Sequence, residues 1–144
     1  MSTPFGPQLI GETEKTLGAL LRRFLEGTGL TESQWVILRL AGQLGASVDA
    51  NGLVAAVVDR AHLSHAAELV SELTRRGLLD DGRPTAAGRE MTATIQTAIA
   101  TTTAPIWENL PDEDVAAATR VLNEIVTRAR AVIASNSTPS VKRA

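Results

Sequence analysis

The chain has 144 residues, with 14 Lys and Arg, 16 Asp and Glu, no Cys and a formal net charge of −2. Its length is that of one domain, and the balance of 44% hydrophobic and 21% charged residues is typical of a globular protein rather than a disordered chain. The absence of cysteine excludes disulfides and thiolate chemistry, and no apolar run reaches the roughly 20 residues of a membrane span. Because the net charge is close to zero, any nucleic-acid binding must depend on a local basic patch.

Apolar residues recurring at three and four positions predict two helices in the first third of the chain. The first spans residues 8–26 and ends at a pair of glycines. The second begins at Thr31, because Thr31-Glu32-Ser33-Gln34 has the spacing of a capping box, and it ends at Gly45. Trp35 is expected in the core, on the inward face of this second helix.

Two short helices joined by a tight turn follow. We expect the first to run from Asn51 as N-cap to Asp59, and the second to run from Ser64 as N-cap to Arg76. The inward positions of the first are Leu53, Val54, Val57 and Val58, and those of the second are Ala66, Leu69, Val70 and Leu73. Such a pair is a helix-turn-helix unit.

The last third is expected to hold a minimal hairpin and two long helices. Asp81-Gly82 is a hairpin-turn dipeptide within residues 78–84, and Thr85 caps the next helix, in which we expect a kink at Pro105. The inward residues of that helix are Met91, Ile95, Ile99 or Ala98, Thr102 and Ile106. Pro111 opens the last helix in its first turn.

The last helix carries an apolar seam with a period of 3.5 residues, which favours a helix-on-helix dimer interface. The seam consists of Val115, Ala118, Leu122, Ile125, Ala129 and Val132. Residues 135–144 show no pattern and are expected to form a flexible tail.

Three motifs give the chain a family resemblance. They are Leu30-Thr31-x-x-Gln34-Trp35-x-x-Leu38, Leu73-x-x-x-Gly77-Leu78-Leu79 and Thr85-x-x-Gly88. In this order the chain resembles the MarR family of bacterial transcription regulators over most of its length. The resemblance implies a mostly α, homodimeric winged helix-turn-helix protein whose DNA release is often triggered by a small phenolic ligand bound between two lobes.

The resemblance also implies a division of the chain. Residues 1–144 form a single MarR-like domain, in which 30–89 is the helix-turn-helix lobe, 6–27 and 90–134 are dimerisation helices and 135–144 is the tail. We expect a cytoplasmic protein, because the first residues lack a signal-peptide pattern.

The chain departs from the family pattern in its charge. Family members carry a wing of a dozen or so residues with a basic tip, whereas this chain has only Asp80-Asp81-Gly82-Arg83-Pro84 in that place. The predicted 64–76 helix holds two Arg against two Glu, and residues 30–89 hold six Arg against seven Asp and Glu. The basic footprint expected of a DNA-binding surface is therefore missing.

Helical periodicity nevertheless selects candidate site residues. The face of the predicted 64–76 helix opposite its buried stripe supplies the DNA-binding candidates Ser64, His65, Ala67, Glu68, Ser71 and Arg75, and the wing supplies Arg83. The family's ligand cleft implies the pocket candidates Phe24, Trp35, Arg39 and Met91, for a small aromatic or phenolic effector. A core role for Trp35 and a salt bridge at Arg39 are the simpler interpretations.

Two functions remain open at this point. The first is a homodimeric regulator that binds a palindromic site in double-stranded DNA through the 64–76 helix. The second is a MarR-like dimer with lost or weakened DNA binding that serves as a small-ligand or protein-binding module.

Metal binding and catalysis receive less support from the sequence. The spacing His62-x-x-His65 with Glu68 permits a zinc site, but solvated histidines are the simpler interpretation. We expect no metal, no cofactor and no enzyme activity, since no Ser-His-acid set or phosphate-binding loop occurs.

Overall fold

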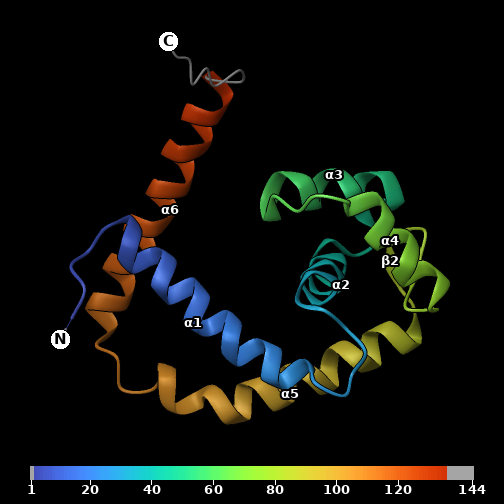
Figure 1. Ribbon diagram of the computed structural model, residues 1–144, viewed down its shortest axis with the longest axis horizontal. Coiled ribbons are helices and arrows are strands. Elements are labelled where there is room, and N and C mark those ends of the chain that lie inside the picture. The colour runs from blue at the N-terminus through green and yellow to red at the C-terminus, as the bar shows by residue number, and fades with distance from the viewer. Residues whose placement is uncertain (1, 136–144) are drawn as a thin grey trace. The chain divides into compact units, whose positions relative to one another are not determined.

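Six α-helices, a short 3₁₀ turn and a two-stranded sheet form the described part of the computed structural model, residues 2–135 (Figure 1). In chain order they are α1 (Pro7–Leu25), α2 (Glu32–Leu44), η1 (Gly45–Ser47), α3 (Ala50–Ala61), α4 (Ala66–Arg75), β1 (Leu79–Asp80), β2 (Arg83–Pro84), α5 (Ala86–Trp107) and α6 (Asp112–Ser135). A helix-turn-helix followed by a small hairpin confirms the predicted mostly α, winged helix-turn-helix class.

The chain divides into two compact units, Met1–Thr103 and Ala104–Ala144. The first holds α1 to α4, the hairpin and most of α5, and the second holds the end of α5 and all of α6. The division falls next to Pro105, which lies inside α5 and removes one backbone hydrogen-bond donor from it.

The connection between α1 and α2 is held by local hydrogen bonds. Thr28 Oγ1 donates to the Leu25 carbonyl oxygen at 2.6 Å and accepts from the Leu30 N–H at 3.1 Å. The Thr31 hydroxyl accepts from the Gln34 N–H at 3.2 Å, and the Gln34 side chain accepts in return from the Thr31 N–H at 3.0 Å. The predicted capping box is thereby confirmed.

The core of the first unit is centred on α2, which contacts α1, α3, α4 and β2. Ile37 and Leu38 are fully buried there, and Leu53 of α3 and Leu73 of α4 are equally buried against them. Full burial of such a side chain contributes about 1.5–3 kcal/mol. Trp35 is 3% exposed, as predicted, so α2 is the platform that supports the two short helices.

α3 begins earlier than the sequence predicts. Asp49, and not Asn51, is its N-cap, and the Asp49 carboxylate accepts from the Gly52 N–H at 2.9 Å. Both residue types cap helices well, so local preference alone did not decide between them. Val58, predicted to face inward, is 52% exposed, because it lies one helical step of 100° past the buried Val57.

The turn between α3 and α4 contains two residues with left-handed backbone, His62 at φ 54° and His65 at φ 60°. α4 begins at Ala66 with His65 as its N-cap residue, and no side chain caps it. The predicted Ser64 cap is therefore wrong, because the left-handed His65 separates Ser64 from the helix. A left-handed residue with a Cβ costs about 1–2 kcal/mol, which the packing around the turn must offset.

The hairpin is as short as predicted. Leu79 pairs with Pro84 and Asp80 with Arg83, and Asp81 and Gly82 both have positive φ, the backbone of a type I′ turn. The next residue, Thr85, caps α5: its hydroxyl accepts from the N–H of the third residue along, at 3.0 Å. This confirms the predicted cap.

The inward face of α5 differs from the prediction at its second half. Ile95 is buried, but Thr103 is inward in place of Thr102, and Ile106 is 43% exposed. Ile95, Ile99 and Thr103 form one row four residues apart, and the Thr103 hydroxyl donates to the Ile99 carbonyl oxygen at 2.7 Å. That bond lets a polar side chain be buried.

α6, described by itself, has no buried residue. Large apolar side chains are exposed along it, among them Val115, Leu122 and Val132 of the predicted seam. The predicted tail, residues 135–144, lies outside the described residues except for Ser135, which ends α6.

Candidate nucleic-acid interface

α4 presents the predicted row of side chains to solvent. The residues concerned are Ser64 and His65 in the turn and Ala67, Glu68, Ser71 and Arg75 on the helix, and all six are exposed. On the opposite face Ala66, Val70 and Leu73 are buried. Periodicity therefore identified the outward face of α4, and the assignment of these residues to DNA remains a prediction.

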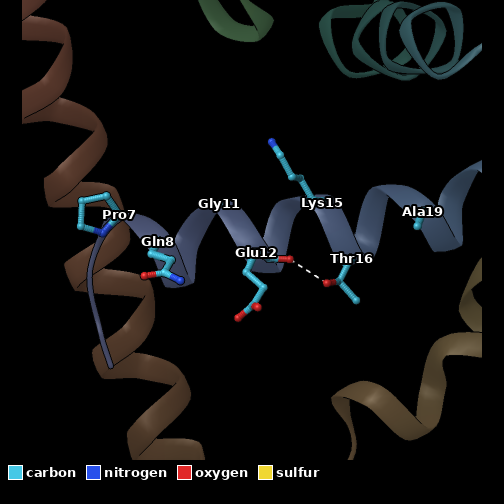
Figure 2. A pocket seen from close by; sticks show the side chains of 7 residues that line it. All are labelled: Pro7, Gln8, Gly11, Glu12, Lys15, Thr16 and Ala19. Carbon is cyan, nitrogen blue, oxygen red and sulfur yellow. Dashed lines mark hydrogen bonds between the residues drawn. The ribbon is translucent and has the colours of Figure 1, made fainter. Parts of the chain in front are cut away.

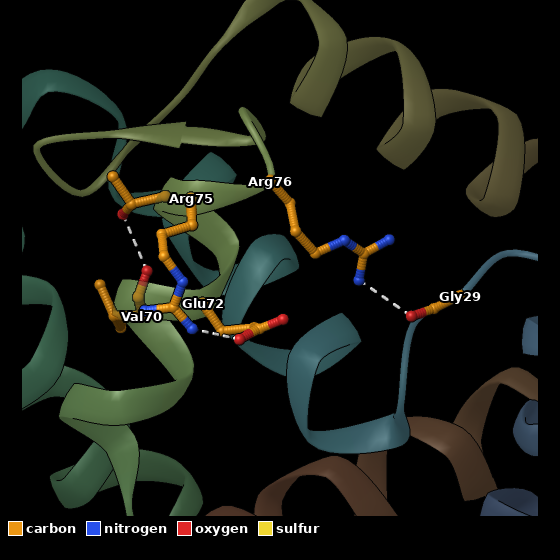
Figure 3. Close-up of polar contacts among 6 residues, drawn as sticks. Gly29, Val70, Glu72, Arg75 and Arg76 are labelled. Carbon is orange, nitrogen blue, oxygen red and sulfur yellow. Dashed lines mark hydrogen bonds and ion pairs between the residues drawn. The ribbon is translucent and has the colours of Figure 1, made fainter.

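The basic side chains of this face lie beside neighbouring carboxylates. His65 Nδ1 lies 3.1 Å from Glu68 Oε1, Arg75 pairs with Glu72 within α4 (Figure 3), and Arg83 lies 3.6 Å from Asp81 in the hairpin. All three pairs are exposed, so they add little stability. The carboxylates beside Arg75 and Arg83 do reduce the positive potential that the face presents to a phosphate backbone.

The hairpin turn lies against the beginning of α3. Asp81 Oδ1 accepts from the Ala50 N–H at 3.2 Å, so a second carboxylate joins the Asp49 cap at this helix end. A Cβ on Gly82 would lie 2.7 Å from the carbonyl carbon and oxygen of Asp49, and Gly82 is buried. The hairpin turn thus packs against the start of α3 and accepts a hydrogen bond from it, a contact that no pattern in the sequence predicts.

A hollow of about 400 Å³ opens between the hairpin turn, the start of α3 and the last part of α4. It is lined by Ala50, Val70, Ser71, Thr74, Arg75 and Asp81. Two of these residues, Ser71 and Arg75, belong to the predicted DNA-binding site. The Thr74 hydroxyl donates a hydrogen bond to the Val70 carbonyl oxygen at 2.8 Å.

Arg76 makes a contact that no local pattern in the sequence predicts. Arg76 is the C-cap of α4, and its guanidinium reaches the α1–α2 connection, where Nη1 donates to the Gly29 carbonyl oxygen at 2.9 Å (Figure 3). Gly29 has φ 79°, and a Cβ there would lie 3.1 Å from Arg76 Nη2. The contact joins the end of α4 to the connection that follows α1.

The four residues expected to line an effector pocket differ in their exposure. Trp35 is buried, Phe24 and Met91 are half-buried, and Arg39 is exposed. A larger hollow, of about 600 Å³, lies instead along α1 and is lined by Pro7, Gln8, Gly11, Glu12, Lys15, Thr16 and Ala19 (Figure 2). The assignment of the four residues to a ligand remains a prediction.

The zinc arrangement that the spacing permitted is not formed. His62 ends α3 and His65 precedes α4, so the two do not share one helical turn with Glu68. Within residues 2–135 no three His, Asp or Glu side chains gather as a metal site would require. Nor does any helix in this part of the chain have the length and apolar character of a membrane span.

The fold and this surface define a helix-turn-helix protein. Residues 55–139, more than half of the chain, match a family described as a helix-turn-helix family. The chain belongs to that helix-turn-helix family. No curated protein and no solved structure matches the chain.

Proposed function

We propose that the protein is a homodimeric transcriptional regulator of the MarR type that binds double-stranded DNA through the exposed face of α4. The observation that carries the proposal is the outward row of polar side chains on the second helix of a helix-turn-helix. Recognition helices of this motif place such a row in the major groove. Membership of a helix-turn-helix family supports the same function.

The dimer is proposed from the apolar seam of α6. Its residues recur every 3.5 positions and, apart from the half-buried Ile125, are exposed in the single chain, so a partner helix would remove them from water. In this proposal residues 30–89 bind DNA, 6–27 and 90–134 dimerise, and 1–144 act as one MarR-like domain. Two-fold symmetry then requires a palindromic site with half-sites about 34–36 Å apart.

A small aromatic or phenolic effector completes the proposal. In this proposal the half-buried Phe24 and Met91 supply apolar surface, and the ligand reaches the buried Trp35 only by exposing part of it. Arg39 supplies a guanidinium that forms no ion pair with another described residue. Such a group can bind a carboxylate or phenolate through two parallel hydrogen bonds. Titration of the protein with an aromatic carboxylate, followed by tryptophan fluorescence in the wild type and in Arg39→Ala, tests this part separately.

The test of the main proposal is fluorescence anisotropy with labelled duplex DNA from upstream of the protein's own gene. The titration is repeated between about 50 and 200 mM salt with unlabelled competitor, because phosphate contacts weaken steeply over that range. Saturable binding that survives competitor is the expected result. A folded dimer that shows no binding at the lowest salt contradicts the proposal.

A second candidate is favoured by one observation, the pairing of His65, Arg75 and Arg83 with carboxylates. It is a MarR-like dimer with lost or weakened DNA binding that holds a small ligand or another protein. The same titration separates the two candidates, since this second protein would remain dimeric and folded while binding no duplex.

A further inference from the structure

The first half of α4 carries an unusual set of exposed groups for a helix that contacts DNA bases. They are an imidazole, a methyl group, a carboxylate and a hydroxyl, from His65, Ala67, Glu68 and Ser71. The guanidiniums of Arg75 and Arg76 lie at the other end, on the last residue of the helix and its C-cap. Because the first residues of a recognition helix contact base edges, the commonest specific contact, Arg or Lys to guanine, is unavailable here.

Glu68 projects into solvent from the outward face of α4. Its side chain is 76% exposed, yet Oε1 lies 3.1 Å from His65 Nδ1, and Oε2 has no partner among the described residues. His65 is the N-cap residue of α4, and its backbone carbonyl oxygen accepts the Leu69 N–H at 3.0 Å. One carboxylate oxygen therefore lies beside the His65 imidazole, while the other faces solvent with its acceptor sites open.

We propose that Glu68 determines sequence specificity by accepting a hydrogen bond from the N4 amino group of a cytosine in the major groove. This rests on the proposed DNA-binding function and adds the base that the helix selects. In the major groove cytosine offers a donor, guanine offers only acceptors, and thymine offers an acceptor and a methyl group. Adenine places an acceptor beside its amino group, so a carboxylate favours cytosine.

The same carboxylate also restricts where α4 can bind. It repels phosphates, so it lowers affinity for every sequence unless a base donor satisfies it. Glu68 therefore acts by excluding sequences without the cytosine, rather than by adding general affinity.

The experiment is selection of binding sites from a random duplex library by the full chain and by Glu68→Gln. Wild type is expected to enrich one cytosine in each half-site. Glutamine pairs with adenine through N6 and N7, so the variant is expected to exchange that cytosine for adenine, with a change in preference of about 10- to 100-fold. Glu14→Gln on α1, which makes the same change in charge outside the helix-turn-helix, is expected to keep the cytosine.

Each other outcome has a definite meaning. If Glu68→Gln selects the same bases as wild type, the inference is overturned while DNA binding stands. If it tightens binding to all sequences equally, Glu68 only repels phosphates, and the inference is again overturned. If folded wild type enriches no sequence, the proposed function fails and the inference falls with it. Because Glu68 is exposed, melting temperatures of the three proteins should agree, which checks that each is folded.

Discussion

Replacing Gly88 with alanine tests how the hairpin is joined to α5. Gly88 is buried in the first turn of α5, and a Cβ there would lie 2.2 Å from the Leu78 carbonyl oxygen, where ordinary contact begins at 3.4 Å. That oxygen also accepts the Thr85 N–H at 3.1 Å. Alanine must therefore displace the Leu78 carbonyl group by about 1 Å or move the start of α5.

The expected loss of stability follows from three contributions. Overpacking of this kind costs about 1–3 kcal/mol, and weakening the Thr85 bond costs about 1 kcal/mol more. The higher helix propensity of alanine relative to glycine offsets about 1 kcal/mol of this loss. The net loss is about 2 kcal/mol, which at roughly 3 °C per kcal/mol for a chain of this size lowers the melting temperature by about 6 °C.

The assay is thermal and urea unfolding of Gly88→Ala beside Gly11→Ala. Gly11 is also helical, but a Cβ there meets no atom within 4 Å, so its replacement is expected to stabilise the protein by up to about 1 kcal/mol. The two substitutions should therefore have opposite signs. Equal stabilisation by both would refute the close approach of Leu78 to Gly88.

Three further predictions concern binding, assembly and the Arg76 contact. Glu68→Arg should tighten non-specific DNA binding at low salt and steepen the slope of log K against log salt by about 1, measured by anisotropy; an unchanged slope would mean that α4 does not approach phosphates. Leu122→Glu should convert the proposed dimer to monomers in sedimentation, whereas Ala131→Glu on the opposite face of α6 should not; if both variants remain dimeric, the seam is not the interface. Arg76→Ala should speed amide hydrogen exchange in the α1–α2 connection by removing the hydrogen bond to Gly29, with little change in melting temperature. An unchanged exchange rate would mean that this bond does not restrain the connection.

The sequence predicted those features whose causes are local. Apolar spacing identified the outward face of α4, because 3.6 residues per turn fixes which side chains share a side. The Thr31 capping box and the Asp81-Gly82 turn were also predictable, since each depends on a few adjacent residues.

Features set by contacts between distant segments could not be predicted in the same way. Asp49 caps α3 where the sequence indicated Asn51. The hairpin turn packs on this helix end, where Asp81 accepts the N–H of Ala50, 31 residues earlier in the chain, and Gly82 lies against the Asp49 backbone. The Arg76 contact with Gly29 spans 47 residues. Hydrophobic periodicity carries no information on such contacts between distant residues. Only the folded structure therefore shows the chemical environment of the candidate site.

The pairing of arginines with carboxylates need not prevent DNA binding. Exposed ion pairs are weak, so a phosphate can replace Glu72 beside Arg75 at small cost. Arg83 can leave Asp81 more readily still, because Asp81 keeps the Ala50 N–H through its other oxygen. The displaced carboxylates stay near the duplex, however, and their repulsion lowers the net gain from each phosphate contact. Affinity of such a face for DNA must therefore come mainly from contacts to bases. The residues at the start of α4 would then contribute most to recognition.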